Sequence, residues 1–208
     1  NNGSMSSLTI EADQVKLGSE AFANCSSLVS VDVNAAVIPS GVFDGCDMLV
    51  NVALGPDVAV VGAYAFRGTQ VSRFSVDDAN PNLSAASNGT YLLSEDDTTL
   101  ILAAPYRTFG TVQASELPDV TTISTGAFAG IENLTAVYLP NVTKVGDYAF
   151  AGSRVSTVQL GQLTEVGDYA FYQTAISVLP DLGQVSSVGN YAFAGTLITE
   201  VTLPDNIT

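Results

Sequence analysis

Val145-Gly146-Asp147-Tyr148-Ala149-Phe150 is a six-residue phrase that the chain repeats. It returns in residues 166–171 and 188–193, and an earlier copy, Val-Gly-Ala-Tyr-Ala-Phe, ends at Phe66. Weaker copies end at Phe22, Phe43 and Phe128, so the seven phenylalanines are spaced 21, 23, 62, 22, 21 and 22 residues apart. A fixed period in the twenties is typical of a solenoid built from stacked coils.

Each copy also contains a short apolar stretch of the form Leu-x-x-Val-x-Leu, about sixteen residues before the phenylalanine. Its last two apolar positions alternate with polar ones, which is the period of a half-buried strand. Stacked in parallel about 4.8 Å apart, such strands bury a shared core. The sequence therefore predicts one parallel sheet, with strands starting near Val31, Val52, Phe74, Val137, Val158 and Val201. A second apolar pair, eight and five residues before each phenylalanine, predicts a shorter row of extended segments on another face.

The repeated phrase itself predicts a one-turn helix in each coil. Three residues before the phenylalanine, six of the seven copies have a residue whose side chain can cap a helix: Ser19, Ser40, Thr125, Asp147, Asp168 and Asn190. Two residues after it stands mostly glycine, which accepts the left-handed conformation that closes a helix. The alanine and phenylalanine are expected to point inward, so that the seven phenylalanines form a buried column.

The repeat is interrupted for 62 residues between Phe66 and Phe128. Asn88-Gly89 is a strong signal for a tight turn, and residues 90–94 and 99–103 are two apolar runs that flank a polar stretch. This pattern predicts a β-hairpin insert at about residues 77–105. We expect residues 1–7 to be a disordered or tag-derived head and residues 8–208 to form a single solenoid domain.

Composition excludes several classes of function. The 208 residues carry 21 acidic and 6 basic side chains, a net charge of −15, which would repel nucleic acid and anionic lipid. No run approaches the roughly 18 apolar residues of a membrane helix, so no membrane insertion is expected in this segment. There is no histidine, which removes the commonest general base and metal ligand. We therefore expect neither an enzyme nor a cofactor or metal site.

The two cysteines occupy the same repeat position one coil apart. Stacked neighbours point their Cβ atoms in parallel, a poor match to the torsion of an S–S bond. Cys25 and Cys46 are therefore expected to be two free, buried thiols that act as small hydrophobic residues.

Together, L-x-x-V-x-L-P and V-x-x-V-G-D-Y-A-F-x-G resemble the BspA-type leucine-rich repeat. The stretches Ala21-Phe-Ala-Asn-Cys25 and Val42-Phe-Asp-Gly-Cys46 are similar to the family's variant with cysteine after the phenylalanine, and the insert is similar to its hairpin interruptions. The resemblance implies a leucine-rich repeat solenoid, mainly of parallel β-strands. It also implies a secreted or cell-surface bacterial protein with a role in adhesion and binding of a host or microbial protein. It supplies no catalytic residues.

Two sets of residues are candidates for binding. Leucine-rich solenoids usually bind on the exposed positions of their main strands, which here include Thr135, Tyr138, Ser156, Gln159 and Thr199. The second set is a column of tyrosines two residues before the phenylalanine: Tyr64, Tyr148, Tyr169 and Tyr191. This column either stacks on sugar rings or a partner, or covers the edge of the core with its hydroxyl groups in water.

Two acidic stretches, at residues 77–80 and 95–97, could gather oxygen ligands for calcium, but neither matches a calcium-binding loop, and polar hairpin turns account for both. The sequence thus favours a non-enzymatic protein-binding module. A glycan-binding surface and a structural stalk that presents another domain are the alternatives. Residues 198–208 begin a further copy without its tyrosine–phenylalanine phrase, so we expect the chain to be part of a longer array.

Overall fold

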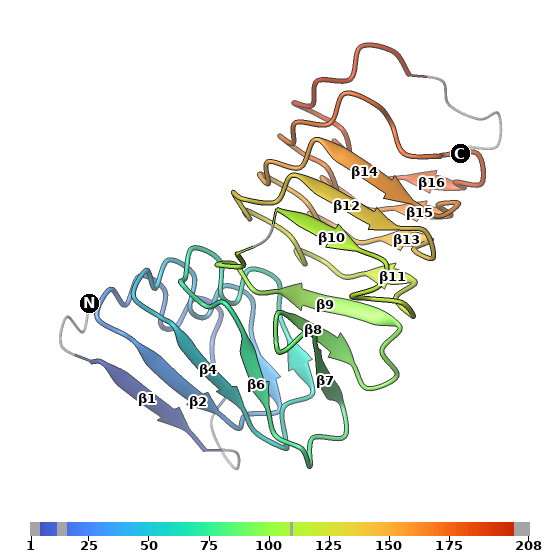
Figure 1. Ribbon diagram of the computed structural model, residues 1–208. Coiled ribbons are helices and arrows are strands. Elements are labelled where there is room, and N and C mark those ends of the chain that lie inside the picture. The colour runs from blue at the N-terminus through green and yellow to red at the C-terminus, as the bar shows by residue number, and fades with distance from the viewer. Residues whose placement is uncertain (1–4, 12–15, 109, 202–208) are drawn as a thin grey trace. The chain divides into compact units, whose positions relative to one another are not determined.

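A computed structural model describes residues 5–11, 16–108 and 110–201, and within these ranges it contains sixteen β-strands and no helix (Figure 1). The chain divides into two compact units. Unit 1 comprises Asn1–Asp96 and Ile101–Arg107, and unit 2 comprises Asp97–Leu100 and Thr108–Thr208. Of the expected head, residues 1–4 lie outside the described ranges, and Ser7 already begins the first strand.

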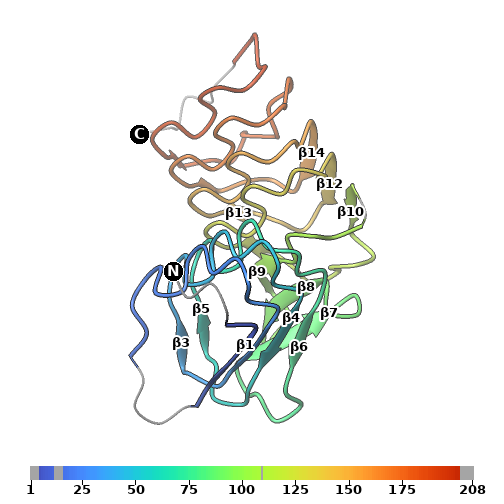
Figure 2. The same ribbon diagram turned by 90° about the vertical axis from the view of Figure 1, so that its left-hand side faces the viewer.

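Unit 1 is built on a four-stranded parallel sheet in the order β1-β2-β4-β6. Its strands are β1 (Ser7–Ile10), β2 (Ser30–Val33), β4 (Asn51–Leu54) and β6 (Phe74–Val76). The register aligns Val31, Val52 and Phe74, all of which are buried. The predicted second row is also present, because β3 (Val37–Ile38) pairs in parallel with β5 (Val60–Val61) on another face of the unit (Figure 2).

The predicted hairpin insert is confirmed. Strand β7 (Leu83–Ala86) pairs antiparallel with β8 (Tyr91–Ser94) around the turn that contains Asn88-Gly89, and β9 (Thr99–Ala103) follows as the neighbour of β8. The carbonyl of Gly89 accepts a hydrogen bond of 2.7 Å from the Phe74 amide, which fixes this turn to β6.

Asn80 anchors the start of the insert. Its side-chain Nδ2 donates to the carbonyls of Gly55 and Val58 at 2.8 and 2.9 Å, and its Oδ1 accepts from the amides of Asn82 and Leu83. This side chain therefore uses all of its main hydrogen-bonding directions on the fold and has none left for a cation.

Unit 2 repeats the same plan. Its main sheet is β10-β12-β14, formed by β10 (Thr111–Gln113), β12 (Ala136–Leu139) and β14 (Thr157–Leu160). Its second row runs from Thr99–Leu100 of β9 through β11 (Thr122–Ile123), β13 (Lys144–Val145) and β15 (Glu165–Val166) to β16 (Ser187–Val188).

The prediction of one continuous main sheet was wrong. The main strands fall into two separate sheets, because the insert takes the place of the strand that would follow β6. Val201 was expected to start a further strand. The described part of the chain contains no strand after β16, and residues 202–208 lie outside it.

The predicted one-turn helices are also wrong. The segments around the phenylalanines are turns, in which only alternate amides bond within the coil. In one coil the other amides, those of Tyr148, Phe150 and Gly152, donate at 2.8 Å to carbonyls of the next coil, 20 residues further along the chain. This alternation requires left-handed backbone, and Tyr148 and Gly152 have φ values of +54° and +67°. A left-handed residue cannot continue an α-helix, so the coil closes as a row of turns.

The predicted helix caps have a different role. Oδ1 of Asp147 accepts the amide of Asp168 at 2.8 Å, and Oδ1 of Asp168 accepts the amide of Asn190 at 2.6 Å. These side chains join neighbouring coils and do not cap a turn of their own. The expectation of left-handed backbone two residues after the phenylalanine is confirmed in all seven copies: Asn24, Gly45, Gly68, Gly130, Gly152, Gln173 and Gly195.

The phenylalanine column is confirmed within each unit. Five of the seven phenylalanines are fully buried, and the two at the ends of the described repeats, Phe22 and Phe193, are half-buried. Their rings stack nearly parallel, at 5.8 and 5.5 Å between centroids in unit 1 and at 5.1, 5.0 and 5.3 Å in unit 2. Stacked rings and buried strand residues together form the core of each coil.

The position three residues after the phenylalanine offers a paired test of buried hydroxyl groups. Thr174 Oγ1 donates to the Phe171 carbonyl at 2.9 Å, whereas Ser153 Oγ is buried and has no hydrogen-bond partner among the described residues. A satisfied buried hydroxyl stabilises a protein by about 1 kcal/mol, and an unsatisfied one is costly. We expect Thr174→Val to lower the free energy of unfolding by about 1 kcal/mol, and Ser153→Ala to leave it unchanged or raise it. Urea titration of both variants measures the difference, and an equal loss in both would contradict this assignment.

Candidate binding faces

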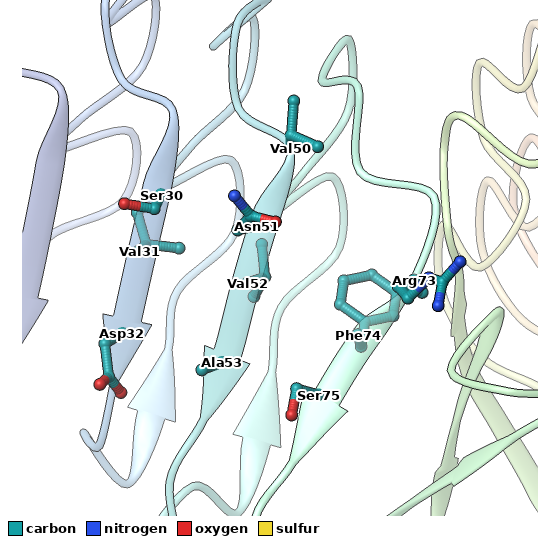
Figure 3. Close-up of a pocket in the computed structure, with 10 residues that line it drawn as sticks. All are labelled: Ser30, Val31, Asp32, Val50, Asn51, Val52, Ala53, Arg73, Phe74 and Ser75. Carbon is teal, nitrogen blue, oxygen red and sulfur yellow. The ribbon is translucent and has the colours of Figure 1, made fainter.

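The solvent-facing side of the unit 1 sheet carries polar and apolar side chains around a shallow pocket of about 360 Å³ (Figure 3). Strand alternation produces it, because Val31, Val52 and Phe74 point into the core while their neighbours point outward. The outward side chains form two rows across the strands. One row is Ser30 and Asn51, followed by Arg73 just before β6, and the other is Asp32, Ala53 and Ser75.

Asp32 and Arg73 lie at opposite ends of this pocket (Figure 3). Both are exposed. The described residues show three ion pairs, Arg67 with Asp44, Lys144 with Glu165 and Arg154 with Glu132, and neither Asp32 nor Arg73 belongs to any of them. The face therefore offers one carboxylate and one guanidinium to a ligand, with small polar side chains between them.

The candidate residues of the main strands lie in unit 2. Tyr138 on β12 is beside Gln159 on β14 and Gln113 on β10, so an amide flanks the tyrosine on each side of the exposed face. Thr135 and Ser156 immediately precede β12 and β14, and their hydroxyls donate to the carbonyls of Gly110 and Thr135 at 2.9 and 3.2 Å. Thr199 is exposed but belongs to no strand. The structure thus brings Tyr138 and Gln159 together and leaves Thr199 apart from them.

The tyrosine column forms a stack of its own. The ring of Tyr169 lies between those of Tyr148 and Tyr191, with centroid distances of 4.8 and 5.0 Å and interplanar angles of 5° and 14°. The neighbouring rings partly desolvate its hydroxyl, and together with the nearby Asp168 carboxylate they raise the pKa of Tyr169. Tyr64 lies in unit 1, where the guanidinium of Arg67 is 4.8 Å from its ring centroid.

This stacking limits what the tyrosine column can bind. A sugar ring stacks on the face of an aromatic ring, and both faces of Tyr169 are already covered. Tyr191, which is 64% exposed, has one face in contact with Tyr169. The faces of Tyr169 are therefore not available for stacking on a sugar ring, and the role of the column as a whole stays a prediction.

The acidic stretches carry no metal site in the described part of the chain, where no group of three or more His, Cys, Asp or Glu side chains is placed to hold an ion. Oδ1 of Asp77 accepts the amide of Ala79 at 2.8 Å, and Oδ1 of Asp96 accepts the hydroxyl of Ser94 at 2.6 Å. Both carboxylates thus form local turn hydrogen bonds.

Both cysteines are free, as predicted, but only Cys46 is fully buried, whereas Cys25 is half-buried. Cys46 Sγ donates to the Phe22 carbonyl at 3.1 Å. Burial raises the pKa of the Cys46 thiol to about 11. The expected thiols therefore differ in their accessibility to reagents.

Thiol labelling tests this difference. At pH 8 we expect Cys25 to react with iodoacetamide at least ten times faster than Cys46, because the thiolate is the nucleophile and its formation at Cys46 is suppressed. Because the pKa of Cys46 is higher in the folded protein, its contribution to stability is complete below pH 9 and is lost as the pH rises toward 11. In urea titrations across this window the wild type should lose more stability than Cys46→Ala, because only the wild type carries the Cys46 thiol. Equal labelling rates would contradict the burial of Cys46.

Sequence reasoning missed the unit 1 face. The candidate binding positions of the main strands all lie in the later coils. The same alternation in β2, β4 and β6 also places Asp32, Asn51 and Ser75 on the exposed side. The signal was therefore present in the sequence. What it lacked was the cross-strand register that puts Asp32 and Arg73 at the two ends of one surface.

Of two solved structures that are similar to this chain, the first supports the fold. A leucine rich cell surface protein from Faecalibacterium prausnitzii is similar over 93% of this chain and 80% of its own, with 17% sequence identity and a TM-score of 0.57. A leucine-rich repeat protein from Eubacterium ventriosum matches 95% of this chain and 84% of its own, with 14% identity and a TM-score of 0.39. No curated protein sequence matches the chain.

None of the described residues forms a helix with the length and apolar character to span a membrane.

The family model for the BspA type leucine rich repeat region matches residues 1–88 and 106–208 in six copies. The unmatched residues 89–105 hold most of the hairpin insert, and the matched copies correspond to the coils on each side of it. With nearly the whole sequence covered and a β-solenoid in each unit, the chain belongs to the BspA-type leucine-rich repeat family.

Proposed function

We propose that this protein is a non-enzymatic, secreted or cell-surface module of a bacterium that binds a host or microbial protein through the exposed faces of its parallel sheets. The observation that carries the proposal is the face of β2, β4 and β6, where a hollow of about 360 Å³ is lined by polar and apolar side chains together. Their strands are held rigidly by parallel pairing on both sides of β2 and β4. Rigid, slightly hollow faces that combine polar and apolar groups, with satisfied backbones, suit the binding of another macromolecule.

The family and the structural relatives support this proposal. The similar protein from Faecalibacterium prausnitzii is described as a cell surface protein, which favours the same location here. The absence of histidine from the sequence further favours binding over acid–base catalysis.

A capture experiment with face variants tests this function. The immobilised chain is exposed to proteins released from the surface of neighbouring bacteria and host epithelial cells. Asn51→Arg and Tyr138→Arg alter the two sheet faces, and Thr164→Arg places the same charge on an exposed residue immediately before β15. We expect a protein retained by the wild type and by Thr164→Arg but lost from at least one face variant. Equal retention by all three variants would contradict binding through these faces.

A glycan is the second candidate partner, and one observation favours it. Tyr138 has no aromatic neighbour among the described residues and lies between Gln113 and Gln159, so it combines a ring with amide donors and acceptors. A glycan array probed with the wild type and with Tyr138→Ala separates this candidate from the first. A glycan that the wild type binds and Tyr138→Ala does not would support glycan binding through this face.

A further inference from the structure

We propose that the face of unit 1 binds an extended peptide segment that carries one acidic and one basic side chain, four residues apart. This inference rests on the proposed function and names the chemistry of its partner. The acidic side chain pairs with Arg73 and the basic side chain with Asp32.

The two charges are placed for recognition of two groups at once. Ser30, Asn51 and Arg73 share one row, and Asp32 lies two residues further along β2, with β4 between it and β6. With about 4.8 Å between strands and about 3.3 Å per residue, the Cα atoms of Asp32 and Arg73 are about 12 Å apart. An extended peptide spans this distance in about four residues, and because its side chains alternate between two faces, residues four apart point to the same face. In Figure 3 the two side chains lie at opposite ends of the pocket.

The surface between the charges suits a peptide backbone. Ala53 lies in the middle of the second row, between Asp32 and Ser75, and its small side chain keeps this part of the face low. Asn51 and Ser75 are exposed and offer an amide and a hydroxyl, which can bond to peptide N–H and C=O groups. Val50, which is 40% exposed, adds an apolar contact at the start of β4.

Charge complementarity selects this partner over singly charged ones. A purely acidic segment would be repelled by the net charge of −15, and a purely basic segment would leave Arg73 without a carboxylate partner. A segment with both charges satisfies Asp32 and Arg73 together. A guanidinium also binds a carboxylate in bidentate geometry, which fixes the orientation of the segment.

Synthetic peptides titrated into the isotopically labelled full chain test the proposal by NMR. The probes are capped heptapeptides of glycine and serine that contain one Glu and one Arg. The two charged residues are placed one to five positions apart along the peptide, in both orders. Peptides with only Glu, only Arg or neither are the ligand controls. The readouts are the Arg73 side-chain Nε–H signal and the backbone amides of Asp32, Ala53 and Ser75.

Four variants accompany the wild type. Asp32→Asn and Arg73→Gln remove one charge each with little change of shape. Ala53→Tyr fills the middle of the face, and tyrosine is a good strand residue, so the sheet should form. Ala136→Tyr makes the same change at an outward position of β12 in unit 2 and is the matched control.

We expect the tightest binding when the two charges are four residues apart, with a loss of about tenfold when either peptide charge is absent. Ala53→Tyr should abolish the shifts and Ala136→Tyr should leave them unchanged, and the affinity should fall at 0.5 M salt. Equal affinity for uncharged peptides, or no shifts at 10 mM peptide, would overturn the inference. If a captured protein is lost with Asn51→Arg but retained by Asp32→Asn and Arg73→Gln, the proposed function survives and this partner chemistry fails.

Discussion

Replacing Phe171 by alanine is expected to lower the free energy of unfolding by about 3–5 kcal/mol, the usual cost of truncating a buried aromatic side chain. Phe171 is fully buried, and its ring stacks on Phe150 at 5.0 Å and on Phe193 at 5.3 Å. The substitution leaves a cavity in the centre of a column, where stacked coils above and below cannot collapse into it. Urea denaturation followed by circular dichroism measures the loss.

The end of the same column provides the control. Phe193 is half-buried and stacks on only one phenylalanine among the described residues. Phe193→Ala should therefore cost about half as much as Phe171→Ala, because less apolar area is returned to water. A loss below about 1 kcal/mol for Phe171→Ala would contradict its burial.

The second large effect is expected at Gly167, in the repeated phrase. A Cβ atom at this position would lie 2.5 Å from the Asp147 amide nitrogen and 2.6 Å from the Gly146 carbonyl carbon. These are backbone atoms of the preceding coil, so they cannot move aside as a flexible side chain would. We expect Gly167→Ala to lower the free energy of unfolding by about 3 kcal/mol, in the upper range for overpacking.

Gly152 separates this steric effect from backbone strain. Its φ is +67°, but a Cβ atom there would meet nothing within 4 Å. Gly152→Ala should therefore cost only about 1 kcal/mol, the penalty for a left-handed residue with a side chain. The midpoints of thermal unfolding of the two variants give the comparison, and a smaller loss in Gly167→Ala than in Gly152→Ala would contradict the close packing of the coils.

The architecture followed from the sequence because its determinants are local and repeated. The spacing of Phe128, Phe150 and Phe171 fixed the coil length, and alternation in stretches such as residues 136–139 identified the strands and their buried side. Asn88-Gly89 identified the turn of the insert for the same reason, since few other dipeptides adopt its backbone conformation.

The conformation of the repeated phrase depended on the neighbouring coil. Asp147 and the small residues around Phe150 suit a helix as well as a turn, and the sequence contains no sign of which hydrogen bonds are made. The Tyr148 amide bonds to the Asp168 carbonyl, so the choice is made by a partner in the next coil and not by the residues beside it. The same applies to the tyrosines, whose stacking became visible only when three coils were aligned.

The sequence by itself thus determined the repeat, the strands, the insert and the buried column of this protein, because each depends on residue type at a fixed spacing. The tertiary structure alone decided that the turns are not helical and that the rings of Tyr148 and Tyr191 cover the faces of Tyr169. It also placed Asp32 and Arg73 at the two ends of one surface. These features depend on cross-coil register, which brings together residues about 20 to 40 positions apart and is set by backbone pairing.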